Sequence, residues 1–199
     1  PELQKAIDEK KLRILANQEC GGSHQVVEWG KAWCHSGFVS QICFVLDADD
    51  AGSKAKKFLQ NDEAIAAKLS KRSMKICQLP KPLYAKELAK RKIVIPITIE
   101  NLIDDSIWID GAQRGWLTER THDEMKRILM RAVPADVSIV DFEQTILQQI
   151  QFLPEFLTHV VRDESKRIFC TTAIQASRNN PDIFREMGPL ITEIESFFK

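Results

Sequence analysis

The stretch QICFVLDADDAG, residues 41–52, decides the fold class that we expect for this chain of 199 residues. Its first six residues are almost continuously apolar, which is typical of a central strand buried on both faces of a sheet. Helix-like segments at 26–34 and 53–69 precede and follow it, and residues 74–79 read as the next strand. This alternation favours a mostly parallel sheet flanked by helices, so the sequence predicts an α/β fold.

Two further strands are predicted outside this central unit. Residues 12–16 form a short apolar run that ends before the Gly21-Gly22 turn. Residues 93–99 are rich in β-branched side chains but include Pro96, which cannot donate a hydrogen bond to a ladder. We therefore expect 93–99 to be an edge strand or to contain a bulge.

The second half is expected to be helical after one small hairpin. Residues 107–109 and 116–117 flank a polar turn and are its predicted arms. From His122 onward the pattern is helical, and Asn180 followed by Pro181 marks the start of the last helix. The helical segments before that helix are 123–132, 141–152, 154–161 and 164–177.

Pro134 is the domain boundary that we expect. It separates an α/β domain at residues 1–133 from a helical extension at 134–199, which we expect to pack on that domain. The final helix carries apolar residues at helical spacing, which fits either core packing or a surface for a dimer or another partner.

Composition excludes several classes of protein. Hydrophobic residues make up 44% of the chain and charged residues 28%, which argues against intrinsic disorder. The 28 basic and 28 acidic residues balance, so only local basic patches are left to contact nucleic acid. Residues 1–11 are polar and no apolar run reaches the length of a membrane span, so we expect a cytoplasmic protein. The five cysteines form no CxxC pair, and neither zinc nor a disulfide framework is expected.

Asp47 and Asp49 are the candidate metal ligands. Two residues apart on an extended backbone, they place both carboxylates on one side at the carboxyl end of a central strand. Oxygen ligands of this kind select hard cations, and we expect Mg²⁺ or Mn²⁺. The alternative is that these acids only cap the helix that begins near Ser53.

The segment Phe44–Gly52 resembles the DxD motif of TOPRIM domains, the metal-binding fold of primases, topoisomerases and several nucleases, and the match includes the trailing Ala-Gly. Downstream, Ile97-Thr98-Ile99-Glu100-Asn101-Leu102 resembles a motif of the OLD (overcoming lysogenization defect) nucleases that supplies another metal ligand. The resemblance implies that Glu100 is that ligand, with Thr98 in place of a small hydroxyl residue. It also implies a catalytic lysine beyond the sheet, for which Lys166 is the candidate.

The sequence departs from the TOPRIM pattern at one position. TOPRIM domains carry a glutamate on their first strand, which in this register would lie before Pro1. Glu19 lies in the turn and Glu28 on the next helix, so neither replaces it.

The resemblance implies a Mg²⁺- or Mn²⁺-dependent endonuclease that cleaves DNA. In the OLD family the nuclease domain follows an ABC-type ATPase, and this chain has no G-x-x-x-x-G-K-[ST] loop, so the ATPase would be another domain or subunit. A homo-oligomer is compatible with this reading.

Other readings of the motif remain. A catalytically incomplete TOPRIM-like assembly domain would also lack the first-strand glutamate. A glycosyltransferase also uses DxD after a strand, but it needs a nucleotide-binding region that the 46 preceding residues do not accommodate. A haloacid-dehalogenase-like phosphatase expects Thr or Val where Ala51 stands.

Overall fold

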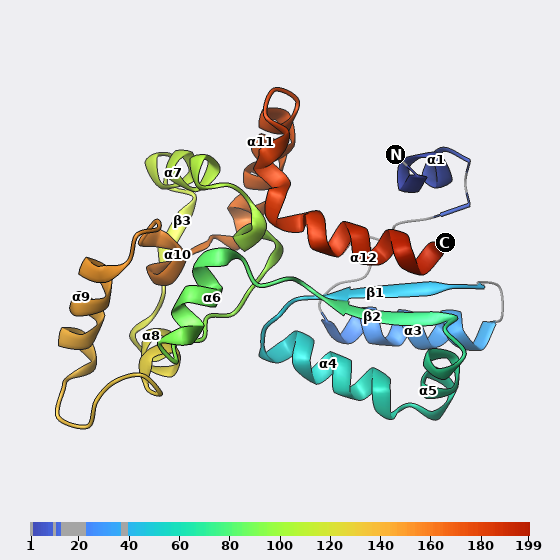
Figure 1. The fold of residues 1–199 in the computed structure, drawn as a ribbon, viewed down its shortest axis with the longest axis horizontal. Coiled ribbons are helices and arrows are strands. Elements are labelled where there is room, and N and C mark those ends of the chain that lie inside the picture. Colours follow the sequence, from blue (N-terminus) through green and yellow to red (C-terminus); the bar gives the residue numbers. More distant parts are fainter. Residues whose placement is uncertain (1, 10, 13–22, 37–39) are drawn as a thin grey trace. The chain divides into compact units, whose positions relative to one another are not determined.

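The computed structural model describes residues 2–9, 11–12, 23–36 and 40–199 (Figure 1). They form a mixed α/β structure that is mostly helical. The chain divides into two compact units: Pro1–Pro80 with Gly188–Lys199 is the first, and Lys81–Met187 is the second. The boundary expected at Pro134 falls inside the second unit.

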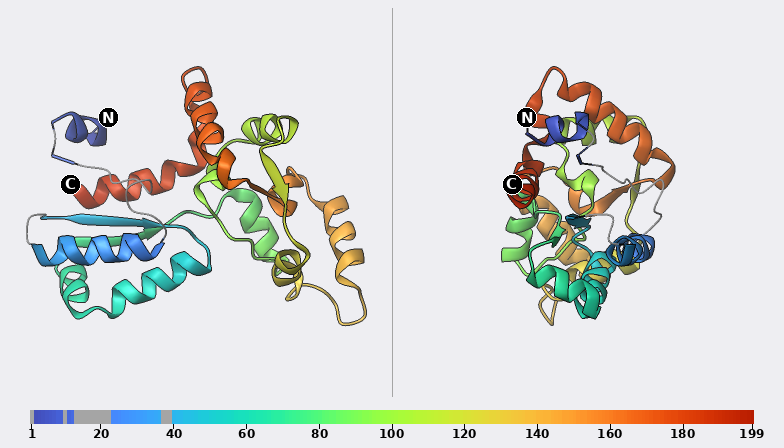
Figure 2. Two further views of the ribbon diagram at one scale, coloured as in Figure 1. Left: turned by 180° about the vertical axis from the view of Figure 1, so that it is seen from behind. Right: turned by 90° about the vertical axis from the view of Figure 1, so that its right-hand side faces the viewer.

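The first unit contains a small parallel sheet. Strands β1 (Ile42–Leu46) and β2 (Met74–Gln78) pair with Phe44 opposite Ile76. One face of this sheet is covered by α3 (Ser23–Ser36), α4 (Asp50–Asn61) and α5 (Glu63–Ser70), and the other by α12 (Gly188–Phe198), as Figures 1 and 2 show.

The helical face of this sheet holds the core of the first unit. The alternation along β1 directs Phe44 and Leu46 toward the helices, where they pack with Val27, Leu59 and Ile65. On the other face, the Lys75 ammonium lies 3.1 Å from the Glu193 carboxylate, which ties α12 to the sheet.

The second unit is built around aromatic side chains. Trp108, Phe156 and Phe169 are almost completely buried, and the Tyr84 ring stacks on Phe156 with 4.1 Å between centroids. A short antiparallel pair, β3 (Leu117–Glu119) with β4 (His159–Val161), crosses this unit. Its helices are α6 (Leu83–Lys90), η1 (Ile99–Leu102), α7 (Asp105–Gln113), α8 (His122–Leu129), α9 (Ile139–Gln149), α10 (Glu155–Thr158), η2 (Asp163–Ser165), α11 (Lys166–Ser177) and η3 (Pro181–Met187).

The central strand–helix–strand pattern is confirmed. The helix expected at 26–34 is α3, the strand expected at 41–46 is β1, and the region 53–69 forms α4 and α5. The predicted strand at 74–79 is β2. Residues 13–16, most of the first predicted strand, lie outside the described residues. Asn180 accepts a hydrogen bond from the Asp182 amide at 3.1 Å and caps η3 (Pro181–Met187), but the last helix, α12, begins only at Gly188, because the chain is kinked at Phe184.

Three predictions in the second unit were wrong. Residues 93–96 have no regular secondary structure, with Ile93 and Ile95 buried and Val94 exposed; within the predicted strand only Ile97 forms a single β-bridge, and Ile99 already begins η1. The predicted hairpin is absent, because 107–109 lie inside α7. The segment 154–161, predicted as a helix, ends in strand β4 because that strand pairs with β3.

No helix among the described residues is both long and apolar enough to cross a membrane.

Candidate functional site

The candidate site begins at the carboxylate loop, which we define as residues Asp47–Asp49. Asp47 follows β1 directly and is exposed, and Asp49 is half-buried at the N-cap of α4. The Asp49 Oδ1 atom accepts a hydrogen bond from the Gly52 amide at 2.6 Å. The capping alternative is therefore present in the structure. A carboxylate has two oxygens, so this bond leaves Asp49 with acceptor capacity for a cation.

Gly52 explains why the loop and α4 lie so close together. A β-carbon at this position would lie 2.0 Å from the Asp47 carbonyl oxygen and 2.9 Å from its carbon. Both atoms belong to the backbone and cannot rotate away. The glycine after the acids therefore permits the first turn of α4 to fold back against Asp47, which fixes where the Asp47 backbone lies.

Glu100 lies in a different environment, on the 3-10 turn η1. Only 6% of this residue is exposed. Its carbonyl oxygen accepts a hydrogen bond from the Trp108 indole at 3.0 Å, and Asn101 closes the turn by accepting from the Thr98 amide and hydroxyl at 2.9 and 3.0 Å. Thr98 thus serves the turn as a capping residue, and its hydroxyl donates to Asn101.

Lys166 is the first residue of α11. Its ammonium lies 2.8 Å from the Asp163 carboxylate, and 45% of its side chain is exposed. The pKa of Asp163 is lowered, first by this hydrogen bond and then by the lysine charge. The lysine is therefore a charged group at the surface of the second unit.

Glu100 and Lys166 both influence the pKa of the Cys170 thiol. Burial is the main cause that raises the Cys170 pKa; the Glu100 charge raises it further, and the Lys166 charge lowers it. Aromatic packing joins the turn of Glu100 to the helix of Lys166. The Trp108 indole, which donates to the Glu100 carbonyl, packs edge-on against the Phe169 ring with 5.6 Å between centroids. Two of the sequence-predicted residues, 66 positions apart in the chain, thus act on one side chain.

The four sequence-predicted residues fall into two pairs. Asp47 and Asp49 share the carboxylate loop of the first unit, and the charges of Glu100 and Lys166 both act on the pKa of Cys170 in the second. Within either unit, the described residues gather no group of three or more His, Cys, Asp and Glu side chains able to hold a metal.

The sequence reasoning assigned no role to Cys170. One signal was present: Cys170 follows Lys166 by four residues, which places both on one face of a helix. No local pattern in the sequence connects Glu100 with Cys170, because Glu100 lies on a turn far from Cys170 in the chain.

Comparison with protein-family models, with curated proteins and with solved structures found no match to this chain.

Proposed function

We propose that this chain is a TOPRIM-like nuclease domain of an OLD-like system, with a helical C-terminal extension, and that it cleaves DNA with Mg²⁺ or Mn²⁺. The observation that carries the proposal is the carboxylate loop at the carboxyl end of a parallel strand, where open α/β sheets bind their ligands. The close approach at Gly52 supports it, because a loop that served only as a solvated connection would not need that glycine.

The residues present suit a hard divalent cation. Asp47 and Asp49 offer carboxylate oxygens within the first unit, and Glu100, which belongs to the second unit, is the further ligand that the resemblance implies. When bound, such a cation activates water and neutralises charge on a phosphoryl group. Lys166, charged and partly exposed, is suited to stabilise the negative charge that develops on the phosphate oxygens.

The proposal also includes partners. DNA is the substrate, an ABC-type ATPase domain or subunit is the coupled partner, and the cytoplasm is the proposed location. The exposed Ile191 on α12, 45% accessible, is compatible with a homo-oligomeric contact.

A second candidate function is favoured by one observation. Because Asp49 already caps α4 through Oδ1, the chain also fits a TOPRIM-like assembly domain with an incomplete metal site. In that case the acids would stabilise the start of a helix and hold no cation.

The test is a calorimetric Mn²⁺ titration together with a plasmid-nicking assay on the Asp47→Asn/Asp49→Asn variant. Asparagine caps a helix as well as aspartate does, so the start of α4 is retained while both charges are removed. We expect loss of Mn²⁺ binding and a fall in nicking of about 100-fold or more. The matched control is Asp50→Asn, the exposed acid next in sequence, which should bind and nick as the wild type does.

Two outcomes would count against the nuclease. Negligible Mn²⁺ binding by the wild type would leave Asp49 as a cap and favour the assembly domain. Nicking that persists in the double variant would place the reaction, or a contaminating nuclease, outside the carboxylate loop.

A further inference from the structure

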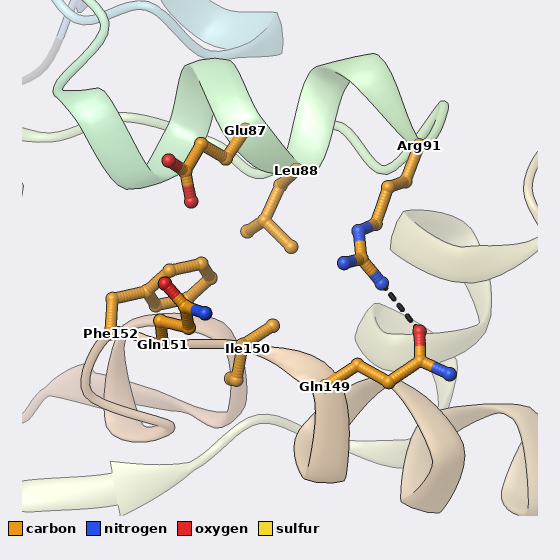
Figure 3. Close-up of a pocket in the computed structure, with 7 residues that line it drawn as sticks. All are labelled: Glu87, Leu88, Arg91, Gln149, Ile150, Gln151 and Phe152. Atoms are coloured by element: carbon orange, nitrogen blue, oxygen red, sulfur yellow. Dashed lines mark hydrogen bonds between the residues drawn. The ribbon is translucent and has the colours of Figure 1, made fainter.

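A cavity of about 210 Å³ lies in the second unit, and none of the four residues discussed above lines it. It is bounded by the last turns of α6 and by the segment that follows α9 (Figure 3). Leu88, Ile150 and Phe152 form its apolar lining. Its polar lining is formed by Glu87, Arg91, Gln149 and Gln151.

The two charged groups of the cavity, one on α6 and one at its C-cap, do not pair. Glu87 and Arg91 are four residues apart, a spacing at which opposite charges ordinarily attract on a helix surface. Arg91 instead donates to the Gln149 amide oxygen at 2.6 Å, so its head is held toward α9. Glu87 forms no ion pair with any residue that the structure describes.

This arrangement limits the chemistry of a ligand. A phosphate would be attracted by Arg91 and repelled by Glu87. A simple cation would be attracted by Glu87 and repelled by Arg91. A fitting ligand therefore has hydrogen-bond donors for the carboxylate and acceptors for the guanidinium, together with an apolar face for Leu88 and Phe152.

Guanine has these features on adjacent edges. Its O6 and N7 atoms accept two hydrogen bonds from an arginine, which is the commonest specific contact to a base. Its N1–H and N2–H groups donate side by side, as a carboxylate requires. None of adenine, cytosine and thymine has both this pair of acceptors and this pair of donors. Aromatic rings bind any base by stacking, and the Phe152 ring, which rests on Tyr84 at 5.5 Å, is held in place for that role.

We propose that this cavity binds a guanine base, with Glu87 accepting from N1–H and N2–H, Arg91 donating to O6 and N7, and Phe152 against the ring. The guanine could come from DNA, as an unpaired or extruded base, or from a free nucleotide. The DNA source rests on the proposed nuclease function, whereas the chemistry of the cavity does not.

Binding is measured in EDTA, so that no cleavage takes place. The probes are dGMP and dAMP, and two single-stranded oligonucleotides, one of thymine alone and one with a single central guanine. We expect dGMP to bind about tenfold or more tightly than dAMP, and the guanine oligonucleotide to exceed the thymine one by a similar factor. Glu87→Gln and Arg91→Lys should each remove most of this preference, because each leaves a single hydrogen bond where two were made.

The matched control is Lys86→Gln on the same helix, an exposed residue that does not line the cavity. It should keep the preference for guanine. Equal affinity for dGMP and dAMP, or an equal loss in Lys86→Gln, would overturn the proposal. A preference for dGMP without one between the oligonucleotides would overturn the DNA source and support a free nucleotide.

The Asp47→Asn/Asp49→Asn variant separates this proposal from the nuclease. It should lose nicking and keep its preference for guanine. A guanine preference in a chain that never nicks would support the cavity proposal and refute the nuclease. Nicking by a chain without a guanine preference would support the nuclease and refute the cavity proposal.

Discussion

The acids of the two units differ in how they are held. In the first unit, Asp47 is exposed at the end of a strand and its position is fixed through the backbone, by the approach of α4 at Gly52. In the second unit, Glu100 is buried in a short turn held by side chains, with the Trp108 indole on its carbonyl.

This difference teaches where each site is vulnerable. A loop placed by backbone contact is sensitive to an added β-carbon, and it tolerates side-chain changes that keep the Asp49 cap of α4. A buried acid placed by packing is sensitive to its own charge and to the charges around it, because burial strengthens electrostatic interactions.

The largest effect on stability is expected from Gly52→Ala. The new β-carbon must displace backbone atoms of Asp47, so we expect a loss of about 2 kcal/mol in the free energy of unfolding and weaker Mn²⁺ binding. Urea unfolding measures the first and calorimetry the second. The matched control is Gly188→Ala at the start of α12, where a β-carbon meets nothing within 4 Å and should be neutral or stabilising. Equal stability of the two variants would show that the backbone approach at Gly52 does not hold the carboxylate loop in place.

A smaller effect is expected from the buried thiol of the first unit. Burial first, and then the charge and hydrogen bond of Cys43, raise the pKa of Cys77 from 9.0 to about 12. The folded state therefore favours the protonated thiol, so the stabilisation is complete below pH 9 and is lost as the pH rises from 9 toward 12. By pH 10 we expect a loss of about 1 kcal/mol, measured by urea unfolding. Cys77→Ala should show a shallower pH dependence, and parallel curves would contradict the assignment.

The lysines of α4 are expected to contribute less, through phosphate contacts. Lys54 and Lys57 are exposed and lie on the helix that follows the carboxylate loop. Their joint change to Gln should reduce the slope of log affinity for duplex DNA against log salt by about 2. Lys5→Gln/Lys11→Gln is the control, since both ammonium groups already lie near Glu9. An unchanged slope would remove α4 from the DNA-binding surface.

The smallest effect is a change in the alkylation rate of Cys170, followed by peptide mass spectrometry. Glu100→Gln removes a charge that raises the Cys170 pKa, so alkylation should become faster. Lys166→Gln removes a charge that lowers it, so alkylation should become slower. Added Mn²⁺ should speed the wild type and leave Glu100→Gln unchanged if Glu100 is a metal ligand. Rates that move together in both variants would show that neither charge acts on the thiol.

Part of the fold could be predicted because its signals are local. The apolar run of β1, the acids that end it and the Asn180 cap are each written within a few neighbouring residues, and the structure contains all three. The Ile93–Ile95 segment shows the limit of such signals. Its β-branched composition predicted a strand, but a strand also needs a hydrogen-bonding partner, which composition does not identify.

The sequence by itself determined the parallel strand–helix–strand unit, because apolar strands that alternate with helices favour a parallel sheet, and it placed Asp47 beside Asp49, because residues close in sequence cannot be far apart in space. Tertiary structure alone decided that β4 pairs with β3, that Glu100 and Lys166 act on Cys170, and that Glu87 and Arg91 face one cavity without pairing. Each of these depends on a partner tens of residues away. The free energy of such contacts comes from burial and packing that form only when the whole unit has folded.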